Sequence, residues 1–172
     1  METLANGQKE VRYAGFWLRF VAYIIDDFLL GLVGFIISIP FIGGIVFSAI
    51  GIGEHPDSAE NIFRGVAGIF GSIFGLIIVV TIMGWLYYAL MESSKAQGTL
   101  GKMALGLKVT DLEGEPISFA RATGRYFGKI ISGMILYIGY ILAGLTEKKQ
   151  ALHDIMASCL VVRKDNLSEN TA

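Results

Sequence analysis

Long uncharged, apolar stretches alternate with short charged ones along this chain of 172 residues. No charged residue lies between Phe28 and Gly53 or between Gly65 and Met91, and both stretches exceed the roughly 20 residues that a helix needs to cross a bilayer. A third uncharged stretch, from Ile130 to Thr146, is marginal in length. The pattern predicts two transmembrane helices, the second over about Val66 to Met91, and a third helical segment that either crosses or re-enters the membrane.

The first transmembrane helix is predicted to run from about residue 15 to about residue 38, because aromatic residues suited to the membrane interface cluster at its start. Over that length it would span roughly 35 Å and place Asp26 near the middle of the bilayer. An alternative makes residues 12–27 an interfacial helix and residues 28–50 the crossing. Pro40 would then lie inside the crossing, where proline tends to kink a helix.

Two short segments have the composition of β-strands. Residues 105–110 alternate between apolar side chains and smaller or polar ones, and residues 159–162 form a second β-prone run. If both lie on the same side of the membrane they can pair into a ribbon, whereas a single crossing by the third segment would separate them. A re-entrant or interfacial hairpin over about residues 119–146 is therefore favoured over a third full crossing.

The charges between the apolar stretches predict the orientation. The loop over residues 53–65 holds three acidic residues and one basic residue, whereas residues 92–129 hold six basic ones. Basic residues favour the cytoplasmic side, so the N-terminus and the β-ribbon are expected there. The expected fold is an all-α protein of the bacterial inner (plasma) membrane, with two full transmembrane helices, a third re-entrant or transmembrane helical segment and a small cytoplasmic β-ribbon. The six bases are Lys95, Lys102, Lys108, Arg121, Arg125 and Lys129.

Composition supports a membrane protein and excludes several other classes. Hydrophobic residues make up 53% of the chain, charged residues only 17%, and the mean hydropathy is +0.59. A net charge of −1 gives no basic surface for nucleic acid. The lone Cys159 cannot form an internal disulfide, and His55 and His153 are predicted on opposite sides of the membrane. We therefore expect no nucleic-acid partner, no metal and no cofactor.

The segment at residues 98–102, with the sequence GTLGK, superficially resembles a phosphate-binding loop. Ala96 and Met103 occupy positions where that motif requires glycine and serine or threonine. The chain also lacks a recognisable set of nucleophile, base and orienting residue, so we do not expect an enzyme.

Three charged residues in the first apolar segment are the main functional lead. Arg19 and Asp26 are seven residues apart, which places them on one helix face roughly 10 Å apart, and Asp27 follows directly. Charged groups inside a membrane are costly and commonly functional. Two adjacent aspartates would titrate as a coupled pair and could exchange H⁺ for Na⁺, or the same residues could form a structural latch.

Several short motifs together resemble the RDD family of membrane proteins. They are AGFWLR at residues 14–19, YIID at 23–26, GTLGK at 98–102, GLKV at 106–109 and ALHD at 151–154. Arg19, Asp26 and Asp154 match the arginine and two aspartates that name the family, whereas Asp27 lies outside the pattern. The resemblance implies a small integral membrane domain, and a transport role that includes cation and proton exchange has been proposed for the family.

Two alternatives for function and for the partner of Arg19 remain open. Arg19 could pair with Asp26, or with Asp154 if the C-terminal segment folds back. The chain could be a subunit of a cation/proton or small-solute transporter, or a non-transporting accessory, scaffold or assembly subunit in which these residues form a latch.

A glycine stripe in the second apolar segment suggests how the chain assembles. Gly68, Gly71 and Gly75 recur at three- and four-residue steps, which allows another helix to approach closely. Besides the lipid bilayer, we expect a homo-oligomer or a larger membrane complex as partner. The domain boundaries are predicted as a polar tail at residues 1–12, a membrane domain at 13–164 and a C-terminal tail at 165–172.

Overall fold

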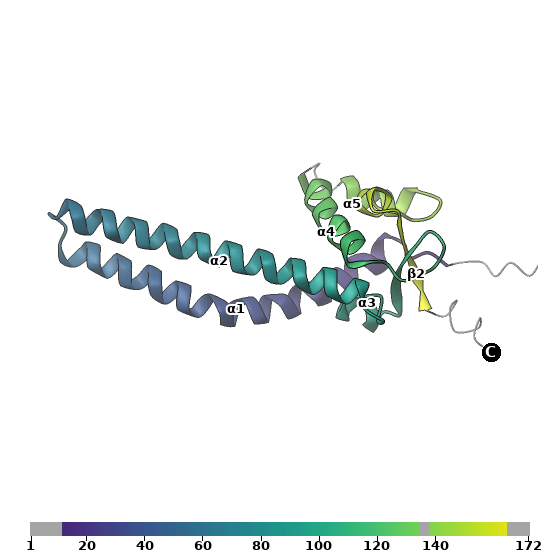
Figure 1. The fold of residues 1–172 in the computed structure, drawn as a ribbon, viewed down its shortest axis with the longest axis horizontal. Helices are drawn as coiled ribbons and strands as arrows, with labels where there is room; N and C mark the ends of the chain where they lie inside the picture. Colours follow the sequence, from purple (N-terminus) through teal and green to yellow (C-terminus); the bar gives the residue numbers. More distant parts are fainter. Residues whose placement is uncertain (1–11, 135–137, 165–172) are drawn as a thin grey trace, which may run out of the picture. The chain divides into compact units, whose positions relative to one another are not determined.

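The computed structural model describes residues 12–134 and 138–164 and confirms the predicted fold class (Figure 1). Two long apolar helices are accompanied by four shorter helices and a two-stranded ribbon among these residues. The predicted tails, residues 1–12 and 165–172, lie outside the described residues apart from Arg12, so their boundaries remain predictions. In chain order the elements are α1 (Phe16–Glu54), α2 (Ala59–Ser93), α3 (Leu100–Ala104), β1 (Leu107–Asp111), α4 (Phe119–Met134), α5 (Ile138–Leu145), α6 (Leu152–Met156) and β2 (Cys159–Arg163).

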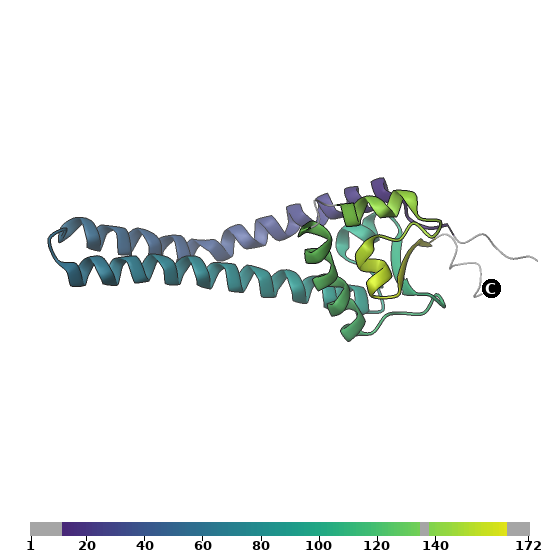
Figure 2. The same cartoon turned by 90° about the horizontal axis from the view of Figure 1, so that it is seen from above.

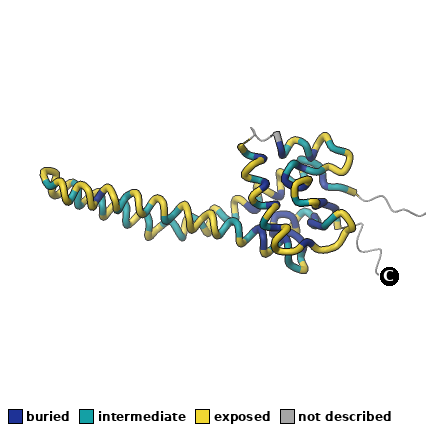
Figure 3. The backbone as a smooth tube through the Cα atoms, turned by 45° about the horizontal axis from the view of Figure 1, so that its top comes forward, coloured by how far each residue is buried: buried dark blue, intermediate teal, exposed yellow. Residues whose placement is uncertain are grey.

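The chain forms two compact units. Residues 27–86 form one, called here the hairpin unit, and the described parts of residues 1–26 and 87–172 form the other, called the ribbon unit. Buried positions concentrate in the ribbon unit, whereas exposed and half-buried positions alternate along the hairpin (Figure 3). Side chains therefore pack a core in the ribbon unit, while the hairpin exposes its apolar side chains as a membrane protein does to lipid.

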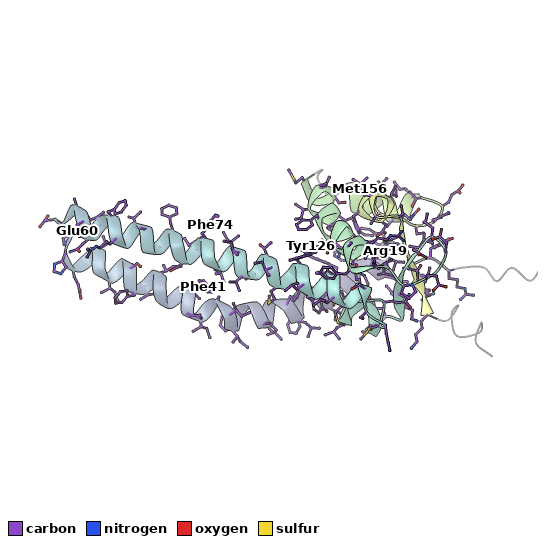
Figure 4. All side chains as sticks on the ribbon, viewed as in Figure 1. Arg19, Phe41, Glu60, Phe74, Tyr126 and Met156 are labelled. Atoms are coloured by element: carbon purple, nitrogen blue, oxygen red, sulfur yellow. The ribbon has the colours of Figure 1, made fainter. Side chains whose placement is uncertain are left out.

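The hairpin unit consists of the antiparallel parts of α1 and α2, which lie side by side in Figures 1 and 2. Each part is about 42 Å long, enough to cross the roughly 30 Å hydrocarbon core. Small residues bring the helices together: a Cβ added to Gly44 would lie 2.7 Å from the Ser72 Oγ, and one added to Gly75 would lie 2.9 Å from a ring carbon of Phe41. Large apolar side chains such as Phe74 remain exposed along the hairpin (Figure 4).

The predicted end of the first crossing near residue 38 is wrong. The helix continues through Pro40 to Glu54 without a break. Proline and glycine are tolerated in membrane helices, because neighbouring groups can satisfy the freed backbone. The bounds of the alternative crossing, residues 28–50, agree better with the part of α1 that belongs to the hairpin unit, residues 27–54. Residues 16–26, however, are the first turns of the same helix and form no separate interfacial helix.

The ribbon unit is built on the antiparallel pairing of β1 with β2, in a register from Leu107 opposite Arg163 to Asp111 opposite Cys159. The chain before α1 extends this ribbon, since the Ala14 amide donates to the Val161 carbonyl at 2.8 Å. Apolar side chains of both strands, Val109 and Val161 among them, are fully buried. The predicted ribbon is therefore present, with strands that begin or end one or two residues from the predicted limits.

The third apolar segment is bent. The axes of α4 and α5 differ by 98°, and the segment starts and ends at the same ribbon, because β1 precedes it and β2 follows it. A single complete crossing would separate the two strands. Helix α4 buries polar and small residues and exposes apolar ones. Its buried face carries Arg125, Gly128 and Ser132, while Phe127 and Ile130 are about half exposed. Such a helix suits a position where its outer face meets an apolar phase.

Candidate functional site

Asp26 lies at the last position of α1 that belongs to the ribbon unit, and it is almost fully buried. Three neutral donors fill its carboxylate: the Tyr87 hydroxyl and the Gly101 amide each donate to Oδ1 at 2.7 Å, and the Thr99 hydroxyl donates to Oδ2. We call these three residues the Asp26 cradle. A buried carboxylate is stable when it receives this many hydrogen bonds.

The cradle explains the GTLGK segment. Thr99 holds the N-cap position of α3, but its side chain turns to Asp26 instead of capping its own helix. The carboxylate of Asp26 therefore takes the free amide of Gly101 in the first turn of α3. Gly101 must lack a side chain, because an added Cβ would lie 2.9 Å from the Asp26 Cγ and would overlap the Ala22 carbonyl oxygen. The anion that this glycine-containing loop binds belongs to the protein itself.

Asp154, in α6, is fully buried and receives two arginines. Arg19 forms an ion pair with Oδ2, and the Arg125 Nε donates to Oδ1 at 2.7 Å. The Ala151 amide also donates to Oδ2, at 3.1 Å. Arg19 further donates to the backbone carbonyls of Ala14 at 2.8 Å and Lys149 at 2.6 Å, so every group of its guanidinium is engaged.

Burial by itself would raise the pKa of Asp154, but the adjacent Arg125 and Arg19 outweigh it and hold the pKa well below its usual range. Burial lowers the pKa of the neighbouring His153 to about 3, although Asp154 opposes that shift. His153 is thus neutral near pH 7 and does not adjust the charge of Asp154 there. No group of three metal-ligating side chains occurs among the described residues.

Glu92, at the end of α2, is the second buried anion. The Arg125 Nη1 donates to its Oε2 at 2.6 Å, Lys102 forms an ion pair with Oε1, and the Lys129 Nζ lies 3.7 Å from Oε1. Arg125 therefore bridges Glu92 and Asp154 and joins all these groups into one cluster, the charge network. It consists of Arg19, Glu92, Lys102, Arg125, Lys129 and Asp154.

The structure brings together three of the four predicted site residues. Arg19, Asp26 and Asp154 all belong to the ribbon unit (Figure 4 labels Arg19), and Arg19 pairs with Asp154, the second of the two alternatives. Asp27 is exposed, belongs to the hairpin unit and has no hydrogen bond or ion pair with any described residue. Asp26 receives its hydrogen bonds from α2 and from the polar loop and first turn of α3, and its expected position in mid-bilayer stays a prediction.

Four members of the charge network were not foreseen as site residues. Arg125 and Lys129 counted only toward the orientation of the chain, Lys102 toward the orientation and as part of the GTLGK segment, and Glu92 only as the start of a polar stretch. One signal was available: Arg125 and Lys129 are four residues apart and therefore share a face of α4.

The predicted glycine stripe divides between two faces of α2. A Cβ added to Gly68 would overlap the Ser48 side chain of α1, and Gly75 faces Phe41, so both lie against the other helix of the same hairpin. A Cβ added to Gly71 would meet nothing within 4 Å. Contact of Gly71 with a second chain stays a prediction.

Comparisons with known proteins cover nearly the whole described chain. The model of the RDD family matches residues 13–158. The uncharacterized protein YxaI of Bacillus subtilis is 41% identical over 151 residues, which are 88% of this chain and 97% of that protein. The uncharacterized membrane protein YteJ of Bacillus subtilis is 27% identical over 158 residues, 88% of this chain and 82% of that protein. No solved structure shows significant similarity.

Proposed function

The chain belongs to the RDD family, and from that premise we propose that it is a non-transporting accessory or assembly subunit of a membrane complex, in which the charge network is a structural latch. The single observation behind this proposal is that the buried carboxylates are saturated by protein donors. Asp154 receives two arginines and a backbone amide, and Glu92 receives Arg125 and two lysines.

The latch joins parts of the chain that are far apart in sequence. Arg125 bridges the end of α2 to α6, and Arg19 ties the start of α1 to α6 and to the loop before it. Breaking a buried ion pair by removing one partner costs about 3–5 kcal/mol, because a buried charge is left uncompensated. A network of this kind therefore fixes one arrangement of the ribbon unit.

The surroundings of Asp26 are poorly suited to a bound cation. A cation needs oxygen acceptors, whereas the cradle directs an amide and two hydroxyl protons at the carboxylate. Three of the roughly four acceptor sites of the carboxylate are already occupied by these donors, which leaves about one for a cation. The proposal accordingly assigns Asp26 to the folding of the GTLGK segment.

The second candidate function is proton or cation exchange at Asp26. The observation that favours it is that the three groups donating to this buried carboxylate are neutral and that no ion pair to Asp26 occurs among the described residues, where Lys102 interacts with it only at longer range.

Sodium uptake into proteoliposomes under an imposed pH gradient tests the two functions against each other. The wild type is compared with Asp26→Asn and with Asp27→Asn, a matched control one residue away whose side chain is exposed. The accessory role predicts no uptake above empty vesicles for any of the three, and a lowered midpoint of thermal unfolding for Asp26→Asn alone. Uptake by the wild type that Asp26→Asn abolishes, with its fold retained, would overturn the accessory role.

We also propose, from the six basic residues over 92–129 against one over 53–65, that the protein lies in the bacterial inner membrane with its N-terminus in the cytoplasm. Cysteine labelling of intact cells tests this orientation. A cysteine placed in the loop at residues 55–58 should react with a membrane-impermeant reagent, and one at exposed Lys95 should not. The reverse pattern would refute the orientation.

A further inference from the structure

A cavity of about 440 Å³ lies at the start of α1 in the ribbon unit. Three basic side chains line it: Arg12 before α1, Lys149 before α6, and Arg163 at the end of β2. The ribbon holds two of them together, because the Arg163 amide donates to the Arg12 carbonyl at 3.0 Å. The third is placed by the loop that Arg19 anchors through the Lys149 carbonyl.

These three cations lack a counterion among the described residues. No acidic side chain lines the cavity, and none of the three forms an ion pair with a described carboxylate. The charge network nearby does not neutralise them, since its acids are already occupied by Arg19, Arg125 and the lysines described above. The cavity therefore presents a positive charge that an anionic group could balance.

A second cavity, of about 350 Å³, continues from the first. It shares Gly15, Phe16, Trp17 and Lys149 with the first and extends along α5 past Ile141 and Leu145. Residue Trp17 is 73% exposed and Leu145 is 76% exposed, so both are available to a ligand. Arg12 and Arg163 line only the first cavity and the α5 side chains line only the second, while Lys149 lies between them and lines both.

We propose that this site binds an anionic phospholipid. Its phosphate would lie among Arg12, Lys149 and Arg163, and an acyl chain would follow the apolar groove between α1 and α5. Arginine and lysine both bind phosphate oxygens, and basic residues near a membrane surface favour anionic lipids by about 1 kcal/mol each. Inorganic phosphate shares the headgroup chemistry, but it would leave the apolar groove empty. This inference does not depend on whether the protein transports an ion.

Quenching of Trp17 fluorescence tests the proposal in the full chain. The chain contains two tryptophans, so Trp85→Phe leaves Trp17 as the only reporter. The protein is reconstituted in vesicles that contain brominated phosphatidylglycerol or brominated phosphatidylcholine, and quenching is measured against the mole fraction of brominated lipid. We expect phosphatidylglycerol to quench at a lower mole fraction than phosphatidylcholine. Equal quenching by the two lipids would overturn the proposal.

Charge removal identifies the residues responsible. Arg12→Gln/Lys149→Gln should reduce the preference for phosphatidylglycerol by about 30-fold, which corresponds to about 1 kcal/mol for each charge. Lys95→Gln/Lys108→Gln removes the same charge from residues that do not line the cavity and should change the preference by less than about threefold. An equal loss in both variants would mean general surface attraction and would overturn the site.

A variant in the apolar groove distinguishes lipid from free phosphate. Gly144→Leu places a side chain in the groove without changing the charge, and its Cβ would make an ordinary 3.7 Å contact with the Phe16 Cβ. The lipid proposal predicts weaker quenching by phosphatidylglycerol in this variant, with an unchanged circular dichroism spectrum. If millimolar inorganic phosphate abolishes the preference and Gly144→Leu does not alter it, the ligand is phosphate and the lipid proposal is wrong.

Discussion

Replacement of Arg125 by methionine removes the cation that holds the two buried acids together. In Arg125→Met, Asp154 keeps Arg19, and Glu92 keeps Lys102 and the more distant Lys129. Each acid loses one short contact, of 2.7 Å and 2.6 Å respectively, in a place where Arg125 is 2% exposed. Removal of one partner from a buried pair costs about 3–5 kcal/mol, and we expect a loss of stability within that range.

The same substitution on the same helix supplies the control. Arg121 lies four residues earlier in α4, is 40% exposed, and contacts Asp111 at 3.6 Å. An exposed pair of this kind contributes at most about 1 kcal/mol, so Arg121→Met should lower stability by no more than that. The assay is unfolding by sodium dodecyl sulfate in mixed micelles, followed by near-ultraviolet circular dichroism. Equal costs for Arg125→Met and Arg121→Met would refute the latch.

A combined variant tests the physical reason for the loss. Arg125→Met together with Glu92→Gln and Asp154→Asn removes both acids along with the cation. If uncompensated carboxylates cause the loss, this triple variant should be more stable than the sum of its separate changes predicts, by about 0.5–3 kcal/mol. Strict additivity would show that lost packing, and not charge, explains the effect.

Three further predictions concern pH and glycine positions. The pKa of His153 is about 3 in the folded state and near 6.5 in the unfolded chain, so between these pH values the unfolded chain binds the extra proton and stability should fall as the pH drops from about 6.5 toward 3. In thermal unfolding experiments, His153→Gln should flatten this dependence of stability on pH, and His55→Gln should not. Gly101→Ala should destabilise the fold by more than about 2 kcal/mol in the same micelle assay, because its Cβ would collide with the Asp26 carboxyl group. Gly71→Ala should be neutral or stabilise the hairpin by about 0.5–1 kcal/mol, whereas Gly68→Ala should destabilise it.

Each of these predictions has a result that contradicts it. A pH slope that persists in His153→Gln would assign the slope to another group. Normal stability of Gly101→Ala would mean that the loop can move away from Asp26. Loss of assembly in Gly71→Ala, with the monomer intact, would reveal a contact with a second chain at that position.

The apolar parts of the fold were predictable because lipid imposes a simple rule on sequence. A crossing helix needs an uninterrupted apolar stretch, and both such stretches lie within the long helices. The ribbon was also predictable, since the alternation around Leu107 and Val109 has the period of a strand. The end of α1 was not predictable, because proline commonly ends helices in water-soluble proteins but Pro40 does not end this one.

The candidate site was only partly predictable. Arg19 and Asp26 were conspicuous because charges are rare in apolar stretches, and Asp154 was recognised from the family resemblance. Glu92 and Arg125 lie in ordinary charged stretches 33 residues apart, and no periodicity in the sequence indicates that their side chains form an ion pair. Long-range ion pairs depend on how α4 packs, and the choice of its buried face reverses the usual rule that polar side chains face outward.

The ribbon unit is assembled from both sides of the hairpin along the chain, which imposes an order on its biogenesis. During synthesis α1 and α2 emerge and can enter the membrane before Asp154, the ion-pair partner of Arg19, has been made. Strand β1 is likewise made some fifty residues before β2, the strand with which it pairs. The newly inserted chain thus carries uncompensated charges and an open strand edge until its final segment is made. A nascent chain cut short before Asp154 would keep both.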